Sequence, residues 1–390
     1  MANAPAANPA PPNPALSTLP AAPRILIIRF SSLGDVVKCT ALPRLIKAAF
    51  PDARITMLTA SDYLELIADN PHLDQAIGLN RREGRAGFNR LVARLRKAPF
   101  DLIVDVHHSL RSRLLGLYLR GRRTRYSKRS LQRFLLLNFR INAYSEPMGK
   151  EVDFLEGLKP YGVRDDDQGT ELHLGRVAAD EGMRGRMAAE LDQIARWRKA
   201  GLPVVGIAPI AAWDLKRWPL ESFRELMRSY ARETGGGLLI FGGPGDEDAH
   251  GLVNGLEPHA LSLVGRTSHL ESAYFASLTD VVVANDTGMT HLAEAVGTDV
   301  VTLFGPTSRE LGYFPVRSTS RALELPLPCR PCTRMGEGAC GHPLHKACLV
   351  GITPQAVLSE VRSMIARGGA GSGEGQGGGP ANRAQAAPAP

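Results

Sequence analysis

One segment constrains the fold of this chain more than any other: a β-branched run that ends in a tight turn and a helical pattern. Residues 281–284 predict a buried strand, Asp286-Thr287-Gly288 a turn, and the residues through 296 a helix. The first amides of a helix have no partner within it, and the helix dipole is positive there. Together with the Thr287 hydroxyl, this turn predicts a diphosphate site that needs no metal ion. The alternative is that Asp286 or Thr287 only caps the helix.

A matching strand, loop and helix stand near the other end of the chain. Residues 25–30 predict a buried strand, 31–35 (Ser-Ser-Leu-Gly-Asp) a loop, and 36–50 a helix. Two such units indicate two nucleotide-fold halves. With 390 residues and 44% hydrophobic content, the chain is long enough for two cores, because one core seldom grows beyond about 250 residues.

The order of the predicted elements is that of a parallel α/β fold. Strand-like runs alternate with helical patterns, the rhythm of βαβ units. In the first half we expect strands at 24–30, 54–59 and 101–106, and helices at 36–49, 61–68, 87–97 and 109–120. In the second half we expect strands at 204–208, 238–241, 261–264, 281–284 and 300–304. Ligands of open α/β sheets bind beyond the carboxyl ends of the strands, which predicts an active site between the two halves.

These patterns divide the chain into domains. We expect a first Rossmann-like domain over 24–180, a linker region over 181–203 and a second Rossmann-like domain over 204–350. The Ala/Pro-rich residues 1–23 and the Gly/Ala/Pro-rich residues 367–390 are expected to be disordered. There is no signal-peptide pattern and no run of about 18 apolar residues, so we expect a cytoplasmic protein.

The net charge of +8 is concentrated in one part of the chain. Residues 81–150 hold eighteen Lys or Arg against four Asp or Glu. Such a surface suits phosphate on nucleic acid, anionic lipid headgroups or an acidic glycan, and charge alone does not choose among them. A solvated surface that only aids solubility is the alternative.

Five motifs carry a resemblance to a known family: residues 31–35, 105–112, 216–219 (Lys-Arg-Trp-Pro), 242–246 (Gly-Gly-Pro-Gly-Asp) and 286–291 (Asp-Thr-Gly-Met-Thr-His). Over roughly 24–362 the chain resembles the bacterial heptosyltransferases of glycosyltransferase family nine, which build the lipopolysaccharide inner core from ADP-heptose. The resemblance implies a GT-B fold, with two Rossmann-like domains facing a cleft. The second domain would hold the nucleotide sugar and the first the acceptor. It also implies that a final helix, 351–366, crosses back to the first domain.

Asp35 is the candidate catalytic base. Inverting sugar transfer needs a group that takes a proton from the acceptor hydroxyl as it attacks the anomeric carbon. Asp35 follows a glycine turn at a predicted helix start, facing the expected cleft, and the resemblance assigns this role to the matching aspartate. The alternative is that Asp35 is an N-cap of the helix.

The donor site is expected on the second domain. Lys216 and Arg217 lie between a strand and a helix and are candidates to clamp the phosphates. Asp286, Thr287 and Gly288 form the predicted diphosphate turn. His291 lies one helical turn further and either faces the phosphates or is a satisfied interior histidine.

The remaining contacts are expected at the ribose and at the acceptor. Asp246 or Glu247, after the glycine-rich turn, is placed to accept hydrogen bonds from ribose hydroxyls. The resemblance places acceptor contacts on the first domain, at Ser32, Gly34, Asp105, His107, Arg111 and Arg113. Arg111 and Arg113 do not share a helix face, so at most one of them is expected to reach an acidic group of the acceptor.

Four cysteines cluster near the end of the second domain: Cys329, Cys332, Cys340 and Cys348. In the cytoplasm such a cluster favours a structural zinc site over disulfides, although the later spacings are not those of a common zinc finger. A metal-free loop over 329–348 is the alternative. The acidic run 165–167 resembles the metal motif of another glycosyltransferase fold, but it lies in a polar segment away from any strand end, and we reject that interpretation.

Taken with these residues, the resemblance implies an inverting glycosyltransferase that needs no cofactor for catalysis and moves heptose from ADP-heptose to the lipid-linked Kdo/heptose inner core of lipopolysaccharide, Kdo being an acidic sugar. Its basic surface is expected to hold it at the cytoplasmic face of the inner membrane. One alternative is a GT-B enzyme with another nucleotide-sugar donor, or a sugar-nucleotide epimerase. Another is a non-catalytic nucleotide-binding or nucleic-acid-binding protein, although we do not expect a nucleic-acid partner.

Overall fold

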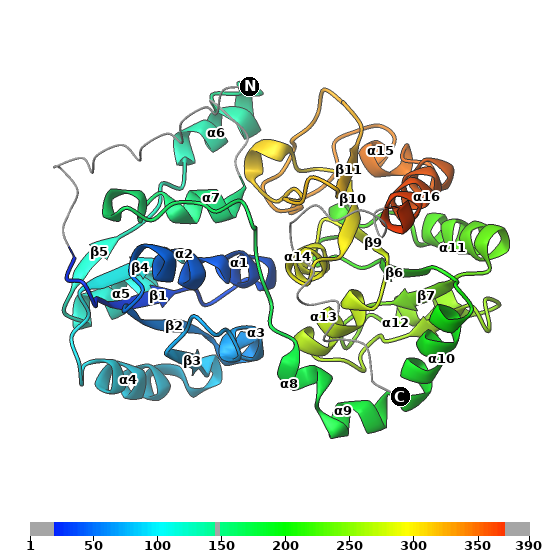
Figure 1. Ribbon diagram of the computed structural model, residues 1–390. Coiled ribbons are helices and arrows are strands. Elements are labelled where there is room, and N and C mark those ends of the chain that lie inside the picture. Colours follow the sequence, from blue (N-terminus) through cyan, green and yellow to red (C-terminus); the bar gives the residue numbers. More distant parts are fainter. Residues whose placement is uncertain (1–18, 145–148, 371–390) are drawn as a thin grey trace, which may run out of the picture.

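The computed structural model describes residues 19–144 and 149–370, which form two α/β domains, each built on a parallel sheet (Figure 1). The first sheet has the strand order β3-β2-β1-β4-β5. Its strands are Arg24–Ile28 (β1), Arg54–Ala60 (β2), Gln75–Leu79 (β3), Leu102–Asp105 (β4) and Arg122–Thr124 (β5). The expected strands β1, β2 and β4 are confirmed. Sequence reasoning missed β3, which is only partly buried, and β5, a polar edge strand of three residues.

The second sheet repeats this order with one more strand, as β11-β10-β9-β6-β7-β8. Its strands are Val204–Ala208 (β6), Gly237–Ile240 (β7), Ala260–Ser262 (β8), Val281–Asn285 (β9), Asp299–Phe304 (β10) and Arg321–Glu324 (β11). The five expected strands are confirmed, and β11 is an additional, partly exposed edge strand. The strand order reverses between β1 and β4 and between β6 and β9. Each sheet therefore has the crevice in which Rossmann-like domains bind ligands.

The helix after β1 is broken in two. The helices of the first domain are Leu33–Lys38 (α1), Ala41–Ala49 (α2), Glu65–Ala68 (α3), Gly84–Leu95 (α4), Leu110–Tyr118 (α5), Ser130–Phe139 (α6) and Lys150–Leu155 (α7). The sequence predicted one helix over 36–49. Pro43 has no N–H for the carbonyl of Cys39, and its ring would clash with that carbonyl in a continuous helix. The chain therefore turns at Thr40, whose hydroxyl donates to the Val37 carbonyl at 2.7 Å.

The second domain is covered by helices on both faces of its sheet. They are Leu220–Thr234 (α11), Glu247–His250 (α12), His269–Ser277 (α13), Gly288–Ala295 (α14), Ala347–Val350 (α15) and Pro354–Ala370 (α16). In Figure 1, α13 and α14 lie on the side of the first domain, and α11 and α16 lie on the far side. The helix that carries the 286–291 motif, α14, is thus turned toward the first domain.

The connection between the domains is shorter than the sequence predicted. Residues 181–203 were expected as a linker, but they contain Glu181–Arg186 (α9) and Ala188–Lys199 (α10). Trp197 of α10 is buried and fills the space beside Gly237 of β7, so α10 belongs to the second domain. The extended segment 163–174, followed by Gly175–Ala178 (α8), is what joins the domains.

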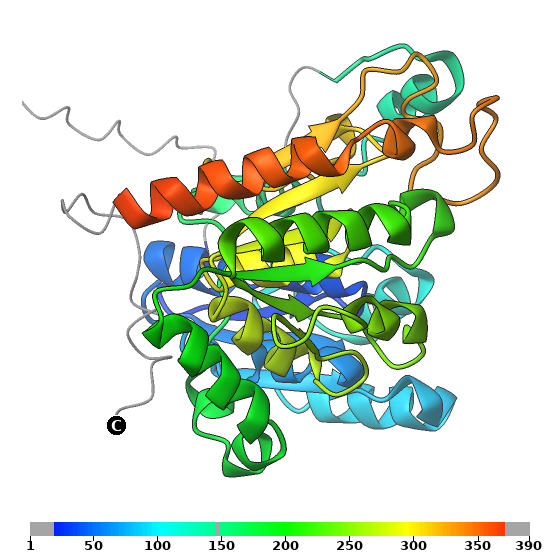
Figure 2. The ribbon, with the colours of Figure 1, turned by 90° about the vertical axis from the view of Figure 1, so that its right-hand side faces the viewer.

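The final helix does not cross back to the first domain, and that prediction is wrong. Figure 2 shows α16 running beside α11 over the second domain. Its apolar face includes Val357, Val361 and Met364, which are buried in a cluster of apolar residues of the second domain. These residues can bury their surface against α11 and strands β9 and β10, so a crossing is not needed to cover them.

The expected disordered tails lie largely outside the described residues. Residues 19–23 are described, and Leu19 packs against the buried apolar cluster that includes Ile25 and Ile27 of β1. Residues 367–370 are the last turn of α16 and not part of a disordered tail. In the described ranges, no helix combines the length and the apolar character needed to cross a membrane.

The domains meet through a close contact of α1 and α14. A Cβ built on Gly34 would lie 2.4 Å from the His291 ring, and one on Gly288 would lie 2.6 Å from the Leu33 side chain. Only glycine lets the two helices approach this closely. One continuous cluster of buried apolar residues joins the domains around this contact.

Candidate active site

Asp35 lies at the start of α1, and its side-chain hydrogen bonds all reach one of its two carboxylate oxygens. Its Oδ2 atom accepts hydrogen bonds from the Ser32 hydroxyl at 3.0 Å and the Ser32 amide at 3.5 Å. Ser32 is the N-cap, so Asp35 is the third residue of a capping box and not the N-cap itself. Oδ2 also pairs with the Arg29 guanidinium. Among the described residues no hydrogen bond reaches the other oxygen, Oδ1.

Arg29, at the end of β1, fixes this carboxylate. Arg29 is 7% exposed, donates to the Val106 carbonyl at 2.5 Å and lies over the Phe154 ring at 5.4 Å. A buried guanidinium needs a nearby anion, and Asp35 supplies it. The ion pair uses Oδ2 of Asp35, and both residues line the cavity between the domains.

His107 lines the same cavity as Asp35. Burial, followed by the charge of Arg29, lowers the pKa of His107 to about 4. Its ring packs edge-on against Phe30 at 5.2 Å. His107 is therefore a neutral hydrogen-bonding group near neutral pH and does not compete with Asp35 as a charged base.

Asp105 shapes the loop after β4. Its Oδ1 atom accepts hydrogen bonds from the amides of His107 at 3.1 Å and His108 at 2.9 Å, and the residue is 4% exposed. An Asp that caps its own turn in this way fixes the following residues. The structure thus places Asp105 behind His107, where it orients the loop.

The two arginines of α5 differ in position. Both are exposed, and Arg111 lines a wide cavity of about 710 Å³ on the first domain. This cavity shares Ser31 and His107 with the Asp35 cavity, and its apolar wall includes Leu114. Arg113 does not line it. Whether either arginine contacts an acceptor stays a prediction.

The cavity around Asp35 contains residues that sequence reasoning missed. Its volume is about 260 Å³, and both domains contribute. The missed lining residues are Tyr126, Lys128, Arg133 and Tyr144 of the first domain and Leu311, Tyr313, Arg334 and Met335 of the second. The surplus of positive charge in 81–150 pointed to the first group without selecting its members. Arg334 lies inside the cysteine-rich segment, where no local signal marked it.

Lys216 and Asp286 meet on the second domain. Lys216 Nζ lies 2.6 Å from Asp286 Oδ2, and both side chains are nearly buried. Asp286 also accepts a hydrogen bond from the Thr307 hydroxyl at 2.9 Å, and Lys216 lies 5.7 Å from the centre of the Tyr313 ring. Because Tyr313 lines the Asp35 cavity, it connects that cavity with the donor motif.

The turn at the start of α14 has the predicted form. Thr287 is the N-cap, with extended backbone, and its side chain makes no capping hydrogen bond. Its hydroxyl is therefore not used to cap the helix. Gly288 also serves the domain contact, because Leu33 occupies the space where a side chain would stand.

His291 is an interior residue. It is 5% exposed, and its ring packs against Gly34 of α1. Burial, together with the charges of Lys38 and Lys216, holds its pKa well below the ordinary value, so the ring is neutral. Of the two interpretations left open by the sequence, the structure favours the interior histidine.

Arg217 and the two ribose candidates are placed differently. Arg217 Nε donates to the Ala211 carbonyl at 2.7 Å, which turns its guanidinium toward its own loop. Asp246 accepts the Gly243 amide at 2.7 Å and closes the glycine-rich turn. Glu247 begins α12 and is exposed. Glu247 is therefore the freer carboxylate for a ribose.

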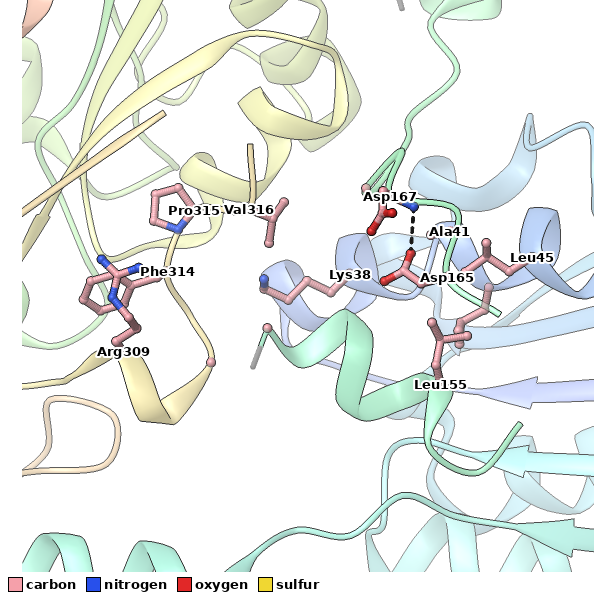
Figure 3. A pocket seen from close by; sticks show the side chains of 14 residues that line it. Lys38, Ala41, Leu45, Leu155, Asp165, Asp167, Arg309, Phe314, Pro315 and Val316 are labelled. Carbon is pink, nitrogen blue, oxygen red and sulfur yellow. Dashed lines mark hydrogen bonds between the residues drawn. The ribbon is translucent and has the colours of Figure 1, made fainter. Parts of the chain in front are cut away.

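A second cavity between the domains has a volume of about 350 Å³. Figure 3 shows Lys38 pointing into it from α1, with Asp165 and Asp167 on one side and Arg309 and Phe314 on the other. The Asp167 amide donates to Asp165 at 3.2 Å, so these two form a turn. The third acidic residue of that run, Asp166, pairs with Arg44 and fastens the connecting segment to α2.

The cysteines are all free thiols. Cys348 is buried, which raises its pKa to about 11, and Cys332 is exposed. Cys340 accepts a hydrogen bond from the Lys346 amide at 3.3 Å. Over residues 19–144 and 149–370, no group of three or more His, Cys, Asp or Glu side chains is arranged to hold a metal ion. The four thiols of the segment nevertheless lie near enough to one another for their charges to interact, and a structural zinc site there stays a prediction.

Two Rossmann-like domains with a carboxylate on one, a helix-start turn on the other and a shared cavity between them are the features of a GT-B glycosyltransferase. A family model confirms this class. The chain belongs to glycosyltransferase family 9 (heptosyltransferase), whose model matches residues 88–339.

Similar proteins cover nearly the whole chain. Lipopolysaccharide heptosyltransferase 2 of Salmonella typhimurium is 25% identical over 359 residues, which are 89% of this chain and 99% of that protein. The crystal structure of a family 9 glycosyltransferase from Veillonella parvula is similar with a TM-score of 0.69 at 19% identity, covering 88% of this chain and 97% of that one. The structure of the ADP-heptose LPS heptosyltransferase II of E. coli gives a TM-score of 0.64 at 21% identity, covering 89% and 99%. The expected GT-B fold is confirmed.

Proposed function

We propose that this glycosyltransferase moves heptose from ADP-heptose to the acidic, lipid-linked inner core of lipopolysaccharide, with inversion and without a metal ion. The observation that supports this most is the position of Asp35. Asp35 lines a cavity that Tyr313 connects with Lys216 and Asp286, and among the described residues no hydrogen bond reaches its Oδ1 atom. The names of the relatives add support, since the Salmonella protein is a lipopolysaccharide heptosyltransferase and the E. coli protein is named for ADP-heptose.

In the proposed reaction, Asp35 acts as a general base. Its Oδ1 takes the proton of the acceptor hydroxyl while that oxygen forms a bond to the anomeric carbon. The bond between this carbon and the diphosphate breaks on the opposite face, which inverts the configuration. ADP leaves with the electron pair. Arg29 pairs with Oδ2, the oxygen that does not take the proton, and so orients the carboxylate.

The leaving diphosphate is bound by the second domain. The free amides at the start of α14, the Thr287 hydroxyl and Lys216 are its proposed partners. Lys216 pairs with Asp286 in this structure, so the donor has to attract the ammonium toward its phosphates. Glu247 is the proposed ribose contact, and Asp246 supports the turn before it.

The acceptor is proposed to bind the first domain. The Asp35 cavity and the wider cavity lined by Arg111 share His107, so they form one continuous surface. That surface combines arginines with an apolar wall that includes Leu110, Leu114 and Tyr118. An acidic sugar attached to a lipid has the same two properties.

The first test is calorimetric titration with ADP, UDP and GDP, each with EDTA present. We expect ADP to bind in preference to the other two, and EDTA to leave both this binding and heptose transfer unchanged, because the phosphate partners are amides, a hydroxyl and a lysine. A preference for UDP would indicate another donor or an epimerase. Absence of binding by all three would indicate a non-catalytic protein.

We also propose that α6 holds the protein at the membrane surface. This helix, at the top of the first domain in Figure 1, exposes Leu131, Phe134 and Phe139, and Phe139 is 61% exposed. Arg140 at its end adds positive charge. Exposed aromatic groups beside basic residues suit an anionic lipid interface.

The double variant Phe134→Ser/Phe139→Ser tests this surface. We expect its binding to phosphatidylglycerol vesicles to fall by about tenfold or more in co-sedimentation, since each buried phenyl ring contributes roughly 1.5–3 kcal/mol. Val350→Ser, at an apolar residue of the second domain that is also exposed, should bind like the wild type. Equal binding by all three proteins would exclude α6 as the membrane contact.

A further inference from the structure

Three cations converge in the cavity beside Asp35. Lys128 precedes α6, Arg133 is on α6, and Arg334 comes from the cysteine-rich segment of the second domain. Arg29 lies in the same cavity, but Asp35 compensates its charge. The other three thus leave the cavity with a surplus of positive charge on the acceptor side of the base.

The described residues offer these three cations no carboxylate partner. Lys128 donates to the His108 carbonyl at 3.1 Å, and Arg133 donates to the Lys128 carbonyl at 3.2 Å and to Ser130 at 3.4 Å. In residues 19–144 and 149–370, the Arg334 guanidinium has neither a hydrogen bond nor an ion pair. Neutral carbonyls and hydroxyls orient a cation, but they do not neutralise it.

The three cations line one cavity, so their like charges repel one another. Burial, and then the charge of Arg334, lowers the pKa of both Lys128 and Arg133. Like charges gathered in one cavity destabilise each other unless an anion binds among them. An anion bound among the three cations would therefore reduce this repulsion.

Arg334 is carried on a well-ordered turn. Thr333 is buried, and its hydroxyl accepts the Gly336 amide at 2.6 Å and donates to Glu337 at 2.8 Å. A Cβ on Gly336, where φ is +98°, would lie 2.8 Å from Trp213 and 2.9 Å from Lys216. The turn thus packs directly on the loop that carries Lys216, and this packing fixes where the segment brings Arg334 to the cavity.

We propose that Lys128, Arg133 and Arg334 bind an oxyanion of the acceptor, a sugar carboxylate or a phosphate, and that Arg334 makes the cysteine-rich segment a determinant of acceptor specificity. This inference rests on the proposed function and adds a contact from the second domain to an acceptor otherwise held by the first. Guanidinium groups match the planar geometry of two oxygens, which gives such a site selectivity for carboxylate and phosphate over neutral sugars.

The test compares Arg334→Gln with Arg228→Gln, which removes an exposed arginine of α11. In a transfer assay with ADP-heptose and Kdo-lipid A, or the same acceptor already carrying one heptose, we expect Arg334→Gln to raise the acceptor KM about tenfold or more. The KM of ADP-heptose and the Kd of ADP should stay near wild type. Arg334→Lys should recover part of the loss, and Arg228→Gln should behave like the wild type. An unchanged acceptor KM in Arg334→Gln would overturn the inference.

A second measurement does not depend on turnover. With ADP bound, thermal unfolding of wild type, Arg334→Gln and Arg228→Gln is compared in inorganic phosphate and in free Kdo. We expect one of these anions to raise the Tm of wild type and of Arg228→Gln more than that of Arg334→Gln, and the anion that does so identifies the group recognised. Equal shifts in all three proteins would refute the anion site. Absence of transfer by the wild type, with the anion effect intact, would instead refute the proposed function.

Discussion

Replacing Asp35 by Asn is expected to lower kcat for heptose transfer by about 10³-fold, within the range that general bases contribute. The amide keeps the shape of the side chain but cannot take the proton of the acceptor. ADP is expected to bind with nearly wild-type affinity, because its proposed partners are on the second domain. The measurements are single-turnover transfer and calorimetric titration with ADP.

Two further variants separate chemistry from folding. Asn at position 35 leaves the buried Arg29 without its carboxylate, which is destabilising in itself. The double variant Arg29→Met/Asp35→Asn removes both charges and should unfold at a higher temperature than Asp35→Asn while remaining inactive. Asp52→Asn, at an exposed carboxylate, is the matched control and should be fully active. Near-normal turnover in Asp35→Asn would rule out this residue as the base.

Replacing Lys216 by Met is expected to weaken ADP binding by about 10–100-fold, the range for one charge-assisted hydrogen bond, and to lower turnover as well. The loss of both follows because Lys216 is proposed to contact the phosphates before and during departure of ADP. The Kd of ADP and kcat are the quantities to measure. Lys346→Met is a suitable control, because Lys346 pairs with Asp214 on the same loop but is not placed at the donor.

Lys216→Met also leaves Asp286 nearly buried without its ion pair. The double variant Lys216→Met/Asp286→Asn removes that unpaired charge and should recover thermal stability but not ADP affinity. If ADP bound equally well to Lys216→Met and to the wild type, the lysine would serve only to neutralise Asp286.

The parts of the site that could be predicted from the sequence are those written in short contiguous motifs. A strand, a turn and a helix that follow one another bring residues 31–35 and 286–288 to the ends of their strands by local geometry alone. The same reasoning failed for residues whose contacts come from distant parts of the sequence. The burial of His291 depends on its contact with Gly34 in the other domain, and no local pattern contains that information.

Other differences have equally physical causes. Arg334 was missed because its place beside the Asp35 cavity depends on where a long irregular segment folds, and no local pattern in residues 329–348 encodes that position. Residues 351–366 were expected to cross back to the first domain by resemblance only. The amphipathic pattern of α16 shows that one face must be covered, but it does not show which domain covers it.

The contact between α1 and α14 has a mechanical consequence. The proposed base, Asp35, lies on the first of these helices, and the proposed diphosphate turn starts the second. The side chains of His291 and Leu33 fill the space beside the two glycines, so the helices are in close contact there. A rotation of the domains that preserves this contact has its pivot there. Near a pivot displacements are small and at the rim they are large, so opening would admit the acceptor at the rim while the spacing of base and leaving group stays almost constant. The two domains could then open and close while the distance between the proposed base and the proposed diphosphate site stays nearly the same at every turnover.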